Sequence, residues 1–121
     1  MGIPLLICDD SSMARKQVVR SLPEQWEVEI EYASNGVEGL EAIRQGKGEM
    51  VFLDLTMPQM DGYEVLQKIR EENHKSVVIV ISGDVQPEAR ERVMGLGALD
   101  FIKKPVDKEK LENVLHQFGL I

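Results

Sequence analysis

The chain has 121 residues, of which 43% are hydrophobic, and its 14 basic and 21 acidic residues leave a formal net charge of −7. A chain of this length can bury a core of its own, so we expect one domain spanning residues 1–121. The acidic balance repels a phosphate backbone, which argues against direct nucleic-acid binding. The longest apolar run, Val77 to Ile81, is too short to span a bilayer, and the single Cys8 cannot form an internal disulfide, so we expect a cytoplasmic protein without membrane contact.

Short apolar runs alternate along the chain with longer amphipathic runs, which predicts a regular succession of strands and helices. In chain order we expect a strand at Pro4 to Cys8, a helix at Ser12 to Leu22, a strand at Val28 to Ala33, a helix after Asn35, a strand at Met50 to Leu53, a helix at Gly62 to Glu72, a strand at Val77 to Ile81, a helix at Pro87 to Leu96, a strand at Leu99 to Ile102 and a helix at Lys108 to Phe118. Asn35, Asp61 and Asp107 stand where helix N-caps are expected. This alternation predicts an α/β domain with a parallel sheet, covered by helices on both faces.

Polar side chains follow the expected strands at their carboxyl ends. Asp9 and Asp10 follow the first strand, Asp54 follows the third, Ser82 the fourth, and Lys103 and Lys104 the fifth. In an open parallel sheet the carboxyl ends of the strands lie along one edge, so side chains far apart in sequence can meet there. These residues therefore predict a polar site at that edge.

Three carboxylates at one edge repel one another unless a cation lies between them. Oxygen ligands suit a hard divalent ion, and a site with few protein ligands that keeps several waters favours Mg²⁺ over a rigid calcium cage. His74 and His116 lie far apart in sequence and outside these loops, so we interpret them as solvated surface histidines and not as zinc ligands. Cys8 lies inside an apolar run and is interpreted as a core residue.

A carboxylate beside a cation, a hydroxyl and an amine has the parts of a phosphoryl-transfer site. A carboxylate can attack phosphorus to give an aspartyl phosphate, and the transfer then needs positioning and charge stabilisation. Taken singly, each residue has a plainer interpretation, such as a helix cap for Asp9 or a solvated amine for Lys103. Only the ensemble predicts phosphoryl chemistry.

Four segments together resemble the receiver domain of bacterial two-component response regulators; they read ICDDS, VFLDLTMPQMDG, VIVISGD and ALDFIKKP. The resemblance extends from Ile3 to about Leu120. It implies a doubly wound (βα)5 flavodoxin-like domain whose five-stranded parallel sheet has the order 2-1-3-4-5. It also implies a signalling phosphoacceptor that promotes its own phosphorylation and dephosphorylation, and not an enzyme acting on external substrates.

The resemblance implies a role for each residue of the site. Asp54 matches the phosphoryl acceptor, and Asp9 and Asp10 match the acidic pair that organises Mg²⁺. Asp10 and Asp54 would be direct ligands, and Asp9 would act mostly through water. The backbone carbonyl of Thr56 would be the remaining protein ligand. Lys104 matches the lysine that pairs with the phosphoryl oxygens, and the peptide bond that follows it is expected to be cis.

The resemblance also implies a switch and its partners. Ser82 matches the switch hydroxyl, and Phe101 matches the aromatic residue that turns inward as the hydroxyl moves, with an output face on the fourth helix, fifth strand and fifth helix, roughly Gln86 to Leu120. The implied partners are a sensor histidine kinase or phosphotransfer protein, which docks near the first helix, and an output protein or domain. A phosphorylation-dependent homodimer is left open. Met13 is expected to contact a partner or to pack in the core, and Trp26 to lie in a loop away from the site.

Three alternatives remain beside this interpretation. A phosphatase or phosphotransferase of the haloacid dehalogenase type would carry a second Asp two residues after its nucleophile, where this chain has Thr56. A flavodoxin-like flavin carrier would have a phosphate loop after the first strand, where Asp9 and Asp10 would repel the phosphate. The third alternative is the same receiver as the regulatory domain of a longer protein, with a chemotaxis-type phosphatase as its output domain.

Overall fold

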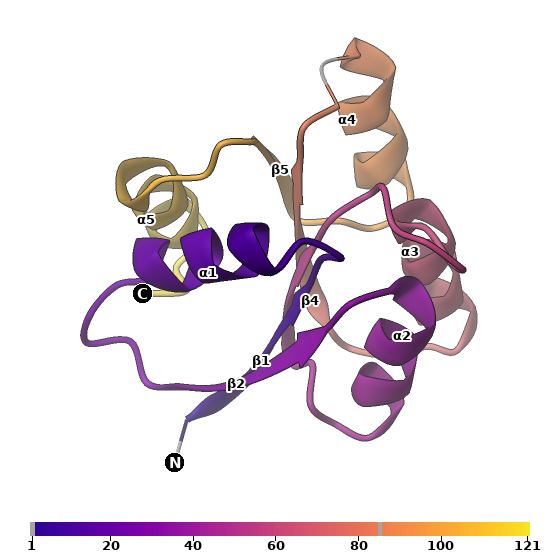
Figure 1. The fold of residues 1–121 in the computed structure, drawn as a ribbon, viewed down its shortest axis with the longest axis horizontal. Coiled ribbons are helices and arrows are strands. Elements are labelled where there is room, and N and C mark those ends of the chain that lie inside the picture. The colour runs from indigo at the N-terminus through magenta and orange to yellow at the C-terminus, as the bar shows by residue number, and fades with distance from the viewer. Residues whose placement is uncertain (1, 85) are drawn as a thin grey trace.

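The computed structural model describes residues 2–84 and 86–121, so that Met1 and Val85 of the expected domain at residues 1–121 lie outside it. Strands and helices alternate in the order β1 (Ile3–Cys8), α1 (Ser12–Ser21), β2 (Val28–Ala33), α2 (Gly36–Arg44), β3 (Met50–Leu53), α3 (Gly62–Glu71), β4 (Val77–Ser82), α4 (Pro87–Gly95), β5 (Asp100–Lys103) and α5 (Lys108–Gln117). The strands form one parallel sheet in the order β2-β1-β3-β4-β5 (Figure 1). The predicted doubly wound architecture and strand order are confirmed.

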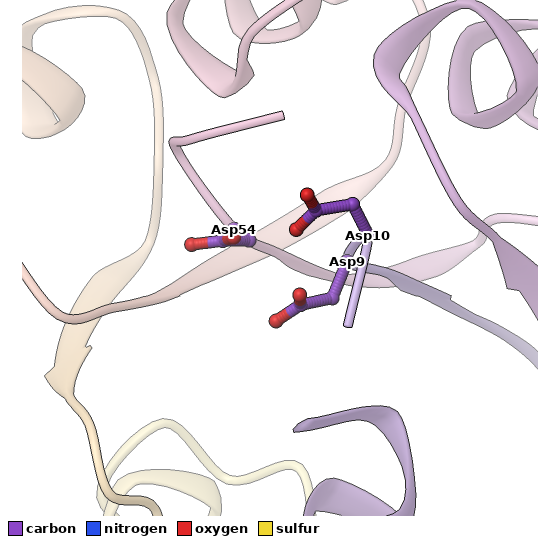
Figure 2. Close-up of side chains that lie close together, drawn as sticks. All are labelled: Asp9, Asp10 and Asp54. Atoms are coloured by element: carbon purple, nitrogen blue, oxygen red, sulfur yellow. The ribbon is translucent and has the colours of Figure 1, made fainter. Parts of the chain in front are cut away.

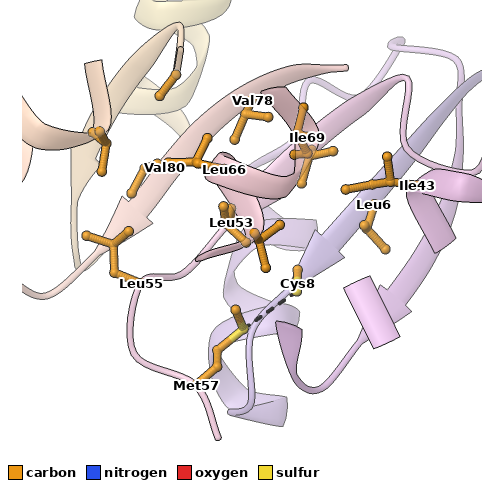
Figure 3. Packing of buried hydrophobic residues seen from close by; sticks show 14 of the residues in the cluster. Leu6, Cys8, Ile43, Leu53, Leu55, Met57, Leu66, Ile69, Val78 and Val80 are labelled. Atoms are coloured by element: carbon orange, nitrogen blue, oxygen red, sulfur yellow. Dashed lines mark hydrogen bonds between the residues drawn. The ribbon is translucent and has the colours of Figure 1, made fainter. Parts of the chain in front are cut away.

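The sheet separates two apolar cores. Along β1, Leu5 and Ile7 pack with residues of α1 and α5, whereas Leu6 and Cys8 pack with residues of α2, α3 and α4. This alternation arises because successive side chains of a strand point to opposite faces. Figure 1 shows the same division, with α1 and α5 on one side of the sheet and the other three helices on the opposite side, and Figure 3 shows the core on that second side. Burial on both faces explains why the inner strands read as continuous apolar runs.

The helices begin at polar caps. The side chains of Asn35, Asp61 and Asp107 each accept a hydrogen bond from the backbone amide three residues on, as predicted. Helix α1 is capped by Ser11, whose side chain accepts from the amide of Ala14. The plainer interpretation of Asp9 as a helix cap is therefore wrong.

Several element boundaries differ from the prediction by one residue. Four helices end earlier than expected, at residues followed by the C-caps Leu22, Glu72, Leu96 and Phe118. Strands β4 and β5 extend one residue further because Ser82 pairs with Lys103 in the ladder. Lys103 is thus a strand residue and exposed, while Lys104 is the first residue of the loop that follows.

Within residues 2–84 and 86–121, none of the helices has the length and apolar content needed to cross a membrane.

Candidate functional site

Two neighbouring strands bring the three predicted carboxylates to one edge of the sheet. Asp9 and Asp10 follow β1, and Asp54 follows β3, where its backbone amide donates to the carbonyl of Cys8 over 2.9 Å. Figure 2 shows the three side chains gathered beyond these strand ends. One oxygen from each carboxylate lies within 4.8 Å of the others. The backbone pairing of β1 and β3 therefore produces the predicted acidic cluster.

The acidic cluster is partly withdrawn from water. Asp9 and Asp54 are buried, at 4% and 6% exposure, whereas Asp10 is exposed. Burial, and next the charge of Asp9, raise the pKa of the Asp54 carboxyl above its ordinary value. The ammonium of Lys104 and the backbone amides of Leu55 and Thr56 act in the opposite direction. The ionised form of Asp54 therefore destabilises the folded state, and additional positive charge nearby would reduce this destabilisation.

Lys104 supplies the cationic side chain of the site. It follows β5, and its peptide bond to Pro105 is cis, as predicted. The Nζ atom lies 2.8 Å from a carboxylate oxygen of Asp9 and 3.5 Å from one of Asp54. Burial by itself would lower the pKa of this ammonium, but the hydrogen bond to Asp9 and the charges of both carboxylates outweigh it and raise the pKa. Lys104 thus remains charged and bridges the two buried carboxylates.

The two predicted switch residues lie on the neighbouring strands. Ser82 is the last residue of β4 and buried, and its Oγ accepts from the backbone amide of Asp84 over 3.2 Å. Phe101 lies in β5, half-buried, and packs against the core beneath α2, α3 and α4. The structure therefore places Ser82 at the same edge as Asp54, while Phe101 belongs to the apolar layer beside it.

The donor set at this edge fits a hard divalent cation. Its members are carboxylate oxygens, and within the described part of the chain the Asp10 side chain has neither a hydrogen bond nor an ion pair. No second group of three or more acidic, histidine or cysteine side chains at ligand spacing occurs among the described residues. Asp9, Asp10 and Asp54 form a site that can hold a metal ion.

The histidines lie outside this site. His74 is not freely solvated as expected, because its Nε2 lies 2.9 Å from a carboxylate oxygen of Glu72, which also pairs with Arg44. Arg44 first, and then His74, lower the pKa of Glu72 to about 2. These residues tie the end of α2 to the end of α3, and His116 is exposed on α5 as expected.

Three side chains that support the site escaped the sequence analysis. The guanidinium of Arg15 donates to the carbonyl of Asp9 over 2.7 Å. Gln17 donates to the carbonyl of Val106 over 3.0 Å, and Lys110 donates to the carbonyl of Pro105 over 3.0 Å. These bonds hold the two loops that carry the acidic pair and Lys104. No sequence motif predicts these bonds, because the long side chains donate to backbone carbonyls that come within reach only when the loops are folded.

A groove of about 500 Å³ lies beside the carboxylates and not over them; its lining residues are Met13, Ala14, Gln17, Val18, Ile81, Lys104, Pro105 and Val106. Met13 is 80% exposed at its rim, so the expectation that this residue could pack in the core is wrong. Cys8, in contrast, is a core residue as predicted, and burial together with the neighbouring acidic charges raises its pKa to about 12.

Comparison with known proteins identifies the family. Residues 5–116 match the family model of the response regulator receiver domain. The chain belongs to this family. Receiver domains of two-component response regulators are signalling phosphoacceptor domains, so the predicted family and the predicted general function are confirmed.

The relatives of this receiver domain differ in length. It is 34% identical over 110 residues to the chemotaxis protein CheY of Treponema pallidum, an alignment that covers 88% of this chain and 76% of that protein. It is 40% identical over 104 residues to a protein-glutamate methylesterase/protein-glutamine glutaminase of Geobacter sulfurreducens, covering 85% of this chain and 28% of the relative. It is 34% identical to the probable C4-dicarboxylate response regulator DctR of Priestia megaterium, covering 50% of that protein. The chain thus spans half or less of the length of several curated relatives.

Solved receiver structures share the fold over nearly the whole chain. The CheX-CheY-BeF3-Mg²⁺ complex from Borrelia burgdorferi matches with a TM-score of 0.86 and 30% identity, covering 95% of this chain and 87% of that one. The receiver domain of the response regulator NarL from Mycobacterium tuberculosis also matches with a TM-score of 0.86, at 25% identity, covering 98% and 97%.

Proposed function

We propose that this receiver domain accepts a phosphoryl group on Asp54 in a Mg²⁺-dependent reaction. The observation that carries the proposal is the convergence of Asp54 with Asp9, Asp10 and Lys104, whose Nζ lies 3.5 Å from Asp54 and 2.8 Å from Asp9. A nucleophilic carboxylate, an acidic pair and a fixed ammonium are the parts that phosphoryl transfer requires. The domain would promote its own phosphorylation and later the hydrolysis of the aspartyl phosphate.

The metal would be held by the oxygen cluster. Asp10 and Asp54 would be direct ligands together with the backbone carbonyl of Thr56, and Asp9 would act mostly through water. The free carboxylate of Asp10 and the repulsion between Asp9 and Asp54 support this assignment. Bound Mg²⁺ would offset the charge of the carboxylates and of the phosphoryl oxygens.

Asp54 would act as the nucleophile. One of its carboxylate oxygens would attack the phosphorus of a phosphohistidine or an acyl phosphate, while the bond from phosphorus to the donor nitrogen or oxygen breaks and its electron pair leaves with the donor. Lys104 would exchange part of its contact with Asp9 for a phosphoryl oxygen, within reach of its present position. The backbone amides of Leu55 and Thr56 favour the ionised nucleophile.

The switch would run through Ser82 and Phe101. The Ser82 hydroxyl would turn from the amide of Asp84 toward a phosphoryl oxygen, and Phe101 would move further into the layer that it already borders. Such a change is a population shift between two packings, driven by charge-assisted hydrogen bonds to the phosphate. The output face would be α4, β5 and α5, the part of the chain from Gln86 to Leu120.

The partners follow from the same proposal. The phosphodonor would be a sensor histidine kinase or a phosphotransfer protein, and exposed Met13 with the adjoining groove supports docking beside α1. The output would be a separate protein or a domain of the same chain, with no direct nucleic-acid contact by the receiver. A cytoplasmic location is part of the proposal, because the one free thiol suits a reducing compartment.

A second candidate concerns the whole protein. Several relatives are protein-glutamate methylesterases of which this chain covers 28% to 32%. They favour a receiver that regulates a methylesterase, in place of the phosphatase output domain that the sequence suggests. Sequencing the reading frame beyond residue 121 tests this candidate, and a stop codon directly after that residue would contradict it.

Phosphorylation is tested by intact mass after incubation with acetyl phosphate, with and without Mg²⁺. We expect one phosphoryl adduct on the wild type that requires the metal and is absent from Asp54→Asn. Lys104→Ala should uncouple phosphorylation from output, and Lys103→Ala is its matched control, because Lys103 is exposed and makes no ion pair within the described residues. An adduct on Asp54→Asn at the wild-type rate would contradict the assignment of the acceptor.

A further inference from the structure

Helix α4 makes only a small apolar contact with the core within the described residues. Its buried residues are Ala89 and Val93, which are small, and the side chain of its N-cap Gln86 makes no capping hydrogen bond within the described residues. On the remaining surface two arginines reach in different directions: Arg90 toward β5, and Arg92 over the ring of Tyr63 on α3, with the guanidinium carbon 3.8 Å from the ring centre. Beside this apolar contact, α4 is joined to β5 through Arg90 and to α3 through Arg92 and through Arg70, which donates to the carbonyl of Gly95 over 3.0 Å.

Arg90 binds the strand that carries the switch aromatic. One of its nitrogens lies 3.0 Å from Oδ1 of Asp100, and the other donates to the carbonyl of Phe101 over 3.3 Å. The same Oδ1 accepts from the backbone amide of Phe101 over 2.8 Å. Both backbone polar groups of Phe101 are thus satisfied by Arg90 and Asp100.

The contact of Arg90 satisfies polar groups that have few other partners. In the described part of the chain, β5 is an edge strand paired only with β4, so the outward peptide groups of Phe101 have no neighbouring strand there. Asp100 is 7% exposed, and removing its arginine would leave a buried carboxylate with a single backbone partner. An exposed ion pair contributes little, but one that satisfies a buried charge contributes more.

We infer that Arg90 is a positioning residue that fixes helix α4 to the peptide of Phe101 through Asp100, and so couples the proposed switch to the output helix. The inference rests on the proposed function, because it takes Phe101 as the switch residue. A change at Phe101 is passed to α4 through three hydrogen bonds and not through the small apolar contact of Ala89 and Val93. Without Arg90, the site would still respond while the response of α4 would be reduced.

Amide NMR of the whole chain tests this coupling, with beryllofluoride and Mg²⁺ as the probe. In the wild type we expect shifts at Asp54 to Thr56 and across α4. In Arg90→Gln we expect the site shifts to persist and those of α4 to shrink roughly fivefold, the lower end of common coupling between sites. The matched control is Arg92→Gln, which loses the contact with Tyr63 but keeps Arg90, and its α4 response should remain. Arg90→Lys, which can still meet Asp100, should recover part of it.

A second measurement tests the contact of Arg90 with Asp100 and Phe101 in the absence of any ligand. Hydrogen exchange at the Phe101 amide should speed up about tenfold in Arg90→Gln and stay unchanged in Arg92→Gln. An α4 response equal to the wild type in Arg90→Gln, with the melting temperature unchanged, would overturn the inference. If the wild type itself shows no shift at Asp54, the proposed function fails. Separately, unchanged hydrogen exchange of the Phe101 amide in Arg90→Gln would overturn the inferred role of Arg90.

Discussion

Asp54 lies beside Asp9, and both carboxylates are buried. The raised pKa of Asp54, caused first by burial and then by Asp9, means that ionised Asp54 weakens the metal-free fold at neutral pH. Asp54→Asn keeps an oxygen for the amide of Leu55 and removes the charge, so we expect it to stabilise the fold by about 1 kcal/mol, which raises the melting temperature by roughly 4 °C in a domain of this size. Thermal unfolding followed by circular dichroism with a chelator present measures this change.

The pH dependence of that gain has a definite sign. A carboxyl whose pKa is raised by folding binds its proton at a higher pH in the folded state than in the unfolded state. Its ionised form therefore destabilises the fold fully above the folded pKa, and this effect fades as the pH falls toward the unfolded pKa. The gain from Asp54→Asn should therefore vanish below the ordinary carboxyl pKa of 3.8. Asp10→Asn, at an exposed position, is the control and should change stability less. A lower melting temperature for Asp54→Asn at neutral pH would contradict the account.

The residues of the site could be found from sequence because each follows a predicted strand. Asp9, Asp10 and Asp54 needed only the rule that parallel strands end at one edge, whereas the choice of Lys104 over Lys103 came from the resemblance to the family. Arg15 could not be found, since its bond to the Asp9 carbonyl depends on the path of a loop. Ser11 could have been found, because serine before a helix is a common N-cap.

At the scale of elements, helix α3 begins directly against the loop that follows β3. The amide of Gly62 donates to the carbonyl of Leu55 over 2.9 Å, and a Cβ on Gly62 would meet the Asp54 carbonyl and the Leu55 Cα. Gly62→Ala should therefore push α3 away from the acceptor loop and destabilise the fold by about 2 kcal/mol, within the range for overpacked sites. Urea unfolding measures the loss, and Mg²⁺ binding should weaken with it.

The chain contains a matched control for this substitution. Gly95 ends α4, and none of the described residues lies within 4 Å of a Cβ placed there, its chain neighbours and its own helix backbone apart. Gly95→Ala should leave stability unchanged or raise it by up to about 1 kcal/mol, because alanine favours a helix over glycine. Equal losses from both alanine substitutions would contradict this account, because the close approach to the acceptor loop exists at Gly62 and not at Gly95.

At the scale of the whole molecule, Trp26 lies at the opposite end of the sheet from the carboxylates. It precedes β2, whose amino end pairs with the start of β1, and its ring centre is 6.4 Å from that of Phe52 in the core beneath α1 and α5. Tryptophan fluorescence should therefore report global unfolding and change little on Mg²⁺ binding. Thr56→Trp, at an exposed position beside Asp54, is the positive control. Strong quenching of Trp26 by Mg²⁺ would contradict this placement.

The parallel sheet with helices on both faces followed from the alternation of strands and helices, because burial on both faces leaves a plain apolar signal in the inner strands. The strand order came from the resemblance to the family. The contacts between elements did not follow. The Arg90 to Asp100 pair and the Arg44 to Glu72 pair join residues 10 and 28 positions apart on separate elements. Charged residues at such spacings are common in sequence, and only the packing decides which of them meet.

The loop around Lys104 has a mechanical consequence. Gln17 of α1 holds it at Val106, and Lys110 of α5 holds it at Pro105, on either side of the groove that Met13 borders. A protein that binds to α1 and α5 together would therefore also restrain the loop that carries Lys104. A docked donor would then also steady the loop that keeps the ammonium beside Asp9 and Asp54, which a small phosphodonor cannot do.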